Sequence, residues 1–375
     1  MTGRSGPSPF VIGPPLGGTG SRHAFVGREE ELNTLRAWVE KTHDRCVYLI
    51  DGPRRMGKTS LAKVLVEELK GWDDSVGVIV NLQDGDTSGE GVLFTVYSVA
   101  EKLWEASTDR PGSVPPPPAD SGRAALHAWF TRFGRSFERD ARLLITLDEA
   151  DRAGAELTAL VRFFQHLQIL SLRLLVISSG RVAHHLSGLL EPAVTATTTA
   201  NAVRPGQEAT VKAQRIDLRP FDRTQVRKLL EIAEDRVWTD AHVDDVWDWT
   251  GGFPVFVQAC GQVLFERSVT GESPPALGAA ARQLVVELAD DQIEAVLSGL
   301  ASLPGGRLVC CASATTPGES LADAFAIASR LRKDTVDPDS PPPDRAGQEP
   351  DAQSAWVFPR FAVIPRSPLL VDVPD

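Results

Sequence analysis

The residues best suited to chemistry lie between Gly52 and Thr59, where the chain reads GPRRMGKT and satisfies the pattern G-x-x-x-x-G-K-[ST]. Glycines let the backbone curl so that successive N–H groups face phosphate oxygens, and a helix that starts there adds its positive dipole end. Lys58 would then reach the β- and γ-phosphates of a nucleotide, and the Thr59 hydroxyl would ligate magnesium. The pattern stands between an apolar strand and an amphipathic helix, which disfavours an incidental glycine turn. The predicted nucleotide-binding residues here are Gly52, Pro53, Arg54, Arg55, Met56, Gly57, Lys58, Thr59 and Ser60.

A second candidate is the acidic pair Asp148 and Glu149, which follows the apolar run at residues 143–147. We expect Asp148 to hold the magnesium through water, together with Thr59. Glu149 is placed to orient or deprotonate an attacking water molecule, with Lys58 as the second catalytic residue. The alternative is that the two acids only cap the following helix. Together the two motifs predict that the chain binds and hydrolyses ATP with Mg²⁺ as cofactor.

These motifs need a scaffold that brings the ends of separate strands together. Short apolar runs predict strands at residues 46–50, 76–80, 143–147 and 172–177. Segments with helical spacing of apolar residues alternate with them, at residues 58–70, 91–105, 124–139 and 156–170. Such alternation favours an α/β fold, a P-loop NTPase parallel sheet flanked by helices. Mostly helical patterns follow, at residues 223–235, 240–250, 256–265 and 276–303.

Composition limits the classes of function. The 375 residues include 39 lysines and arginines and 50 aspartates and glutamates, which gives a formal net charge of -11. This balance disfavours attraction of the whole protein to nucleic acid or to an anionic membrane, although a local basic patch stays open. We find no uncharged apolar run of about 18 residues and no apolar signal segment, so no membrane span is expected. The four cysteines include no C-x-x-C pair, which fits a cytoplasmic protein.

The assembled motifs resemble those of the STAND ATPases, signal-transduction relatives of the AAA+ proteins. The run F-V-G-R-E at residues 25–29, the phosphate-binding loop, the acidic strand and G-G-F-P at residues 251–254 occur in the family's order. The resemblance points to the archaeal/bacterial-type ATPase branch and covers about residues 25–265. It implies that Val26 and Gly27 lie near the adenine, and that Pro254 packs on the nucleotide from a helical lid. Pro254 could instead simply start a helix, where proline is favoured.

The resemblance also bears on Arg181, the last residue of the run S-S-G-R. The family carries a polar or arginine sensor of the γ-phosphate at this place, so Arg181 is a third candidate catalytic residue. In related switches the arginine directly follows two hydroxyl residues, whereas Gly180 intervenes here. A solvated arginine is the alternative.

The predicted organisation has five parts. They are a flexible tail at residues 1–22, a P-loop NTPase core at 23–190, a mobile insertion at 191–214, a helical lid at 215–275 and a winged-helix-like domain at 276–375. In the last part, Arg330, Arg332 and Lys333 form a small basic cluster, or else a solvated helix end.

Three functions follow from these expectations. The first is a slow ATPase that works as a molecular switch, binding ATP and ADP and acting through an effector or sensor protein on another chain. It could form a nucleotide-dependent homo-oligomer, and a bacterial signalling or conflict system would suit it. The second is a DNA-associated ATPase, such as a loader or transposition helper, which the acidic charge disfavours. The third is a binding module without hydrolysis, which Glu149 disfavours. We favour the switch.

Overall fold

The computed structural model describes most of the chain up to residue 295. The described residues are 7–18, 21–41, 47–72, 75–82, 91–108, 114–118, 122–137, 141–154, 156–167, 169, 171–179, 213–289, 291, 292 and 295. The chain divides into two compact units, each described by itself below. The sheet unit comprises Pro15–Gly52 and Gly57–Leu218, and the helical unit comprises Met1–Pro14, Pro53–Met56 and the chain from Arg219 onward.

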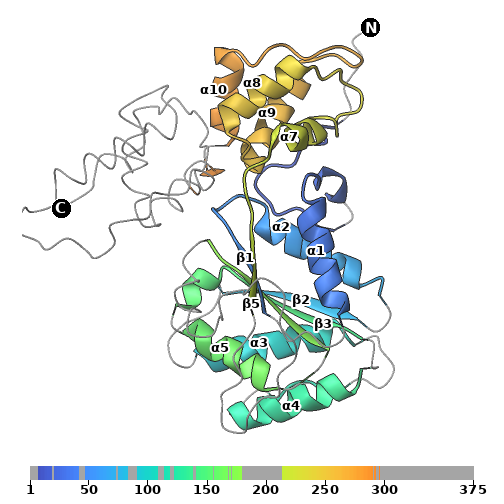
Figure 1. Cartoon of the computed structure of the whole chain (residues 1–375), viewed down its shortest axis with the longest axis vertical. Helices are drawn as coiled ribbons and strands as arrows, with labels where there is room; N and C mark the ends of the chain where they lie inside the picture. Colours follow the sequence, from blue (N-terminus) through green and yellow to red (C-terminus); the bar gives the residue numbers. More distant parts are fainter. Residues whose placement is uncertain are drawn as a thin grey trace, which may run out of the picture. The chain divides into compact units, whose positions relative to one another are not determined.

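The sheet unit is built on five parallel strands in the order β2-β3-β4-β1-β5 (Figure 1). The strands are β1 (Val47–Asp51), β2 (Val76–Asn81), β3 (Leu143–Asp148), β4 (Leu172–Ile177) and β5 (Ala213–Asp217). Neighbouring parallel strands need a crossover, and the helices that follow β1, β2 and β3 along the chain lie in these connections. The structure thus confirms the predicted parallel α/β sheet.

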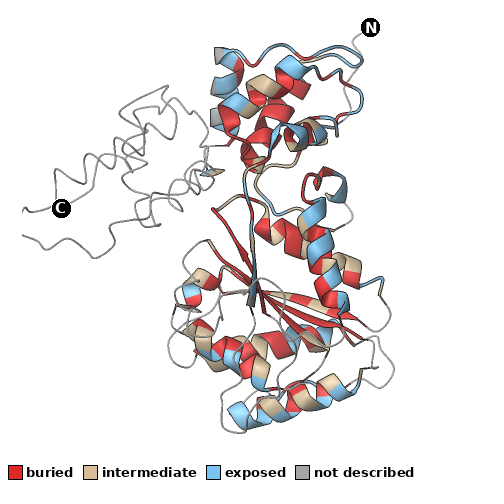
Figure 2. Ribbon diagram, in the orientation of Figure 1, coloured by how far each residue is buried: buried red, intermediate tan, exposed pale blue. Residues whose placement is uncertain are grey.

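Helices cover both faces of this sheet (Figure 1). They are α1 (Glu29–Glu40), α2 (Lys58–Leu69), α3 (Gly91–Glu105), α4 (Arg123–Arg135) and α5 (Glu156–His166). Every residue of β1 and β3 is buried, as the solid red strands of Figure 2 show. Strands buried on both faces require the near-continuous apolar runs that made them predictable from the sequence.

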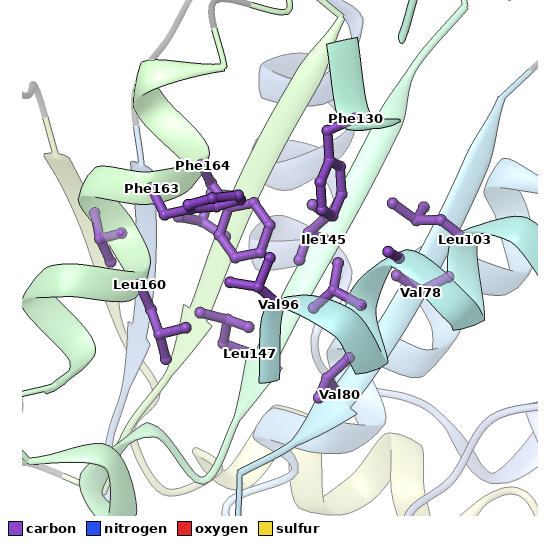
Figure 3. Packing of buried hydrophobic residues seen from close by; sticks show 14 of the residues in the cluster. Val78, Val80, Val96, Leu103, Phe130, Ile145, Leu147, Leu160, Phe163 and Phe164 are labelled. Atoms are coloured by element: carbon purple, nitrogen blue, oxygen red, sulfur yellow. The ribbon is translucent and has the colours of Figure 1, made fainter. Parts of the chain in front are cut away.

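An aromatic cluster fills the space between the sheet and helices α3, α4 and α5 (Figure 3). Phe130 of α4 lies edge-on to Phe163 and Phe164 of α5, with ring centroids 5.9 and 5.7 Å apart. The same core contains Ile145 of β3, so the strand that ends in the acidic pair is packed on large rings. β3 is thus packed against the helices on this face and paired with β2 and β4 in the sheet.

The edge strand β5 was not among the predicted strands. Its sequence, AQRID, has neither an apolar run nor a clean alternation, and Gln214 and Arg215 are exposed. It is nevertheless held in full register on β1, from Val47 opposite Ala213 to Asp51 opposite Asp217. Backbone hydrogen bonds to a neighbouring strand therefore formed this element where side-chain patterning gave no signal.

The helical unit contains α7 (Arg223–Leu230), α8 (Asp240–Thr250), α9 (Pro254–Glu266) and α10 (Ala279–Leu288). Reciprocal side-chain caps begin two of them, Asp222 with Gln225 before α7 and Thr239 with His242 before α8. Helix α9 is almost wholly buried within this unit, which explains its apolar sequence.

The N-terminal segment contributes to the core of the helical unit. Phe10 is 5% exposed and lies edge-on to Trp238 and Phe265, with ring centroids 6.4 Å apart in both pairs. Gly261 of α9 makes room for it, because a Cβ there would lie 2.3 Å from the Phe10 ring. The prediction of a flexible tail for residues 1–22 did not anticipate this packing.

Several predicted features lie outside the described residues. They include Arg181, the cluster of Arg330, Arg332 and Lys333, and nearly all of the predicted insertion at residues 191–214. Apart from α10 (Ala279–Leu288) and a few residues on either side of it, the predicted winged-helix-like domain also lies outside them. Among the helices that the structure does describe, none combines the length and apolar character needed to span a membrane.

Candidate functional site

The loop from Gly52 to Gly57 connects β1 to α2 through backbone conformations that favour glycine. Gly52 has φ +142°, and a Cβ there would lie 2.8 Å from the Leu218 carbonyl oxygen. Gly57 has φ +86° and is the N-cap residue of α2. The two glycines of the pattern therefore turn the chain directly into the start of α2, and the first N–H groups of a helix are where an anion is favoured.

Lys58 is the first residue of α2 and is 7% exposed. Its Nζ donates a hydrogen bond to the Gly52 carbonyl oxygen at 2.8 Å. Burial lowers the pKa of Lys58 from 10.5 to about 8, and nearby carboxylates, Glu149 foremost, act in the opposite direction. Phosphate oxygens brought close to this cation would restore its ordinary pKa, because an opposite charge favours the protonated form.

Thr59 and Asp148 meet at the carboxyl ends of β1 and β3, although 89 positions separate them in the chain. The Thr59 hydroxyl donates to Asp148 Oδ2 at 2.8 Å, and Asp148 Oδ1 accepts from the Glu149 N–H at 2.9 Å. A hydroxyl and a carboxylate are hard oxygen ligands of the kind that Mg²⁺ prefers, and Mg²⁺ usually keeps several waters and binds substrate phosphates besides. The residues predicted to hold the metal thus fit it.

We looked for other candidate metal sites among the residues that the structure describes. They contain no group of three or more histidines, cysteines, aspartates or glutamates that could hold a metal ion.

Glu149 adopts a left-handed backbone conformation, with φ +54°. This conformation costs a residue with a Cβ about 1–2 kcal/mol, and such residues cluster at functional sites. Glu149 begins the short 3-10 helix η2 (Ala150–Ala153), and its carbonyl oxygen accepts from the Arg152 N–H at 3.0 Å. The catalytic role of this carboxylate stays a prediction.

Sequence reasoning missed two polar groups next to these residues. Asp51, at the end of β1, is 1% exposed, accepts from the Gly52 N–H at 2.8 Å and lies 2.9 Å from an Arg215 nitrogen. Asp151 accepts from Ser178 and Ser179 at the end of β4. The only sequence signal for them was an acid just before the loop and a third acid just after the acidic pair.

The remaining predicted residues are distributed over both units. Val26 and Gly27 precede α1 in the sheet unit, where Gly27 has φ +77° and its N–H donates to Glu29 Oε1 at 3.0 Å. Arg55 has φ +65°, and its Nη1 donates to the Gly13 carbonyl oxygen at 3.0 Å within the helical unit. The described residues bring together Lys58, Thr59, Asp148 and Glu149 in the sheet unit.

Pro254 is the first residue of α9, as the helix-start interpretation required. The two glycines before it, Gly251 and Gly252, are each required by the local backbone structure. Gly251 ends α8 with φ +60°, and a Cβ on Gly252 would lie 2.0 Å from the Phe221 carbonyl oxygen. The G-G-F-P run therefore builds the turn between α8 and α9.

This site belongs to the P-loop ATPases. A family model described as an ATPase domain predominantly from Archaea matches residues 25–259, well over half of the chain, and the chain belongs to that family. The protein is an ATP-hydrolysing enzyme, with ATP as its substrate and Mg²⁺ as its cofactor. No curated protein matches the chain.

Solved structures share the fold at low sequence identity. The Walker-type ATPase PABY2304 of Pyrococcus abyssi has a TM-score of 0.54 and 17% identity, over 82% of this chain and 85% of that one. Cdc6p from Pyrobaculum aerophilum follows with a TM-score of 0.46, 16% identity and coverage of 82% and 80%. A point mutant of RuvB from Thermotoga maritima has a TM-score of 0.39, 14% identity and coverage of 82% and 85%. At these identities the likeness concerns the fold alone.

Proposed function

We propose that the protein is a molecular switch of the STAND/AAA+ type that hydrolyses ATP and acts through a partner protein. The observation that carries the proposal is the contact between Thr59 and Asp148, with Glu149 directly after it and Lys58 directly before Thr59. This contact supports our assignment of these four residues to the phosphates, the metal and the attacking water. Loss of the γ-phosphate would change the contacts of all these groups at once.

The chain's own residues divide the hydrolytic step among them. Lys58 would neutralise the β- and γ-phosphates. Thr59 and Asp148 would hold Mg²⁺, which would offset the charge that develops on the phosphate oxygens. Glu149 orients water and accepts its proton as the water oxygen bonds to the γ-phosphorus. The bond from that phosphorus to the bridging oxygen breaks, and ADP and inorganic phosphate are the products.

The switch requires a second contact with the nucleotide outside the sheet unit. A ligand shifts a conformational equilibrium only by the difference in its affinity for the two states. We assign that contact to Pro254. We propose in addition that Val26 and Gly27 lie near the adenine and that Arg181 senses the γ-phosphate. Support for this assignment comes from the family resemblance. The helical unit would then act as the lid.

The read-out of this switch would lie on another polypeptide. We propose an effector or sensor protein as partner, a nucleotide-dependent homo-oligomer, a cytoplasmic location and a role in a bacterial signalling or conflict system. These proposals rest on the resemblance to the STAND ATPases. The DNA-associated alternative depends on a winged helix that falls mostly outside the described residues, and the net charge of -11 disfavours it.

The switch can be tested through Pro254→Ala, with Pro275→Ala, an exposed proline of the same unit, as the matched control. Small-angle scattering should show a wild-type difference between the ADP state and the state with a slowly hydrolysed ATP analogue. Pro254→Ala should lose most of that difference while it binds ADP within about tenfold of wild type, roughly 1.4 kcal/mol. Pro275→Ala should retain it. A wild type without any nucleotide-dependent difference would refute the switch, and an unaltered Pro254→Ala would leave this proline only its helix-starting role.

A further inference from the structure

Asp151 connects the acidic pair to the neighbouring strand by two hydrogen bonds. Its Oδ1 accepts from the Ser178 hydroxyl at 3.0 Å, and its Oδ2 accepts from the Ser179 N–H at 2.6 Å. Ser178 is 1% exposed and follows the last residue of β4. Both oxygens of one carboxylate are thus used to hold the end of β4, and such charge-assisted bonds are about twice as strong as neutral ones.

Ser178 also contacts β1, the strand that leads into the phosphate-binding loop. The Ser178 N–H donates to the Ile50 carbonyl oxygen of β1 at 2.9 Å. Ser178 therefore bonds to β1 through its backbone and to Asp151 through its side chain. Asp151 is in this way joined through a single residue to the strand that ends one residue before Gly52.

Asp151 is also part of the short turn that follows Glu149. This turn, η2, is closed by the hydrogen bond from the Arg152 N–H to the Glu149 carbonyl oxygen. Glu149 has φ +54°, a strained conformation that persists only when the surrounding structure determines it fully. Asp148, just before the turn, is held by its bond with Thr59, and Asp151, within the turn, is held by its bonds with Ser178 and Ser179.

We propose that Asp151 is a positioning residue for hydrolysis, which holds Glu149 in its strained conformation by anchoring η2 to Ser178 and Ser179. Asp151 itself touches neither water nor phosphate in this role. Its contribution passes through Glu149, so the inference rests on the proposed role of that residue. Without the two bonds, the turn relaxes and the Glu149 carboxylate leaves the position from which it activates water.

The test compares ATP binding and turnover of Asp151→Ala with those of wild type. We expect kcat to fall about tenfold or more, part of the effect of a general base, whereas the Kd for magnesium-ATP and the melting temperature stay close to wild type. Arg152→Ala is the matched control, since it alters an exposed side chain of the same turn and keeps the backbone bond. It should leave kcat unchanged.

A double variant separates positioning from an independent effect. If Asp151 acts through Glu149, then Glu149→Gln with Asp151→Ala should hydrolyse ATP no more slowly than Glu149→Gln alone. Multiplication of the two losses would overturn the inference, because independent groups combine in that way. If Asp151→Ala hydrolyses ATP at the wild-type rate while Glu149→Gln is slow, the inference about Asp151 is wrong and the proposed function is unaffected. Full turnover by Glu149→Gln itself would overturn both.

Ser178→Ala keeps the question decidable if Asp151→Ala fails to fold. It removes one of the two bonds to Asp151 and retains the Ser178 backbone bond to Ile50. We expect kcat to fall less than in Asp151→Ala, while the Kd for magnesium-ATP stays unchanged. In the Glu149→Gln background, Ser178→Ala should not lower kcat further. An unchanged kcat in a folded Ser178→Ala protein would contradict the role of the Ser178 contact.

Discussion

The buried lysine of the phosphate-binding loop should make ATP affinity depend on pH above neutrality. Without nucleotide, the pKa of Lys58 is lowered from 10.5 to about 8, since burial penalises the cation. Bound phosphates favour the cation, so binding at high pH must be accompanied by uptake of a proton. The affinity should therefore be flat below pH 8 and fall towards tenfold per pH unit above it. Between pH 7 and pH 9 we expect a loss of about tenfold, or roughly 1.4 kcal/mol.

The assay is calorimetric titration of magnesium-ATP into the protein at several pH values between 7 and 9.5. Titrations in two buffers of different ionisation enthalpy would count the protons taken up, which should approach one per ATP near pH 9. Lys58→Arg is the control, because a guanidinium stays protonated throughout this range. Constant wild-type affinity from pH 7 to 9.5 would refute the reasoning. The same fall in Lys58→Arg would assign the effect to another group.

Three further substitutions test the metal pair and the helical unit. Asp148→Ala should remove much of the magnesium-dependent part of ATP affinity and little of the magnesium-independent part; an equal magnesium effect in variant and wild type would contradict the assignment. Gly252→Ala should lower the free energy of unfolding of the helical unit by more than about 2 kcal/mol in denaturant titrations, since its Cβ would meet the Phe221 carbonyl oxygen at 2.0 Å in a left-handed conformation. Phe10→Ala should cost about 3–5 kcal/mol for a ring that is 5% exposed, and a loss under about 1 kcal/mol would show that the N-terminal segment does not support this core.

The central strands and the phosphate-binding site could be predicted because their signals are local. Strands buried on both faces must be apolar throughout, and β1 to β4 were predicted to within a residue or two. In the loop from Gly52 to Thr59, the positive φ angles of Gly52 and Gly57 are adopted by glycines that the sequence itself shows. The meeting of Thr59 with Asp148 was predictable because parallel strands bring their carboxyl ends to one edge of the sheet.

Other features depend on contacts that no local pattern encodes. Strand β5 has a polar sequence, and it forms because its backbone pairs with β1. The burial of Phe10 depends on the space left by Gly261, some 250 residues later in the sequence. The bonds of Asp151 to Ser178 require the side-chain geometry of two adjacent strand ends. In each case the decisive information is a tertiary contact between distant residues, which spacing along the chain does not show.

The role of Glu149 in hydrolysis is the most direct test of the proposed function. Magnesium-ATP binding and single-turnover phosphate release should be measured side by side for wild type and Glu149→Gln. The amide keeps the shape of the side chain and cannot accept a proton, so binding should be unchanged while phosphate release slows by about a hundredfold or more. Phosphate release by Glu149→Gln at the wild-type rate would contradict the account, because the attacking water would then be activated by another group.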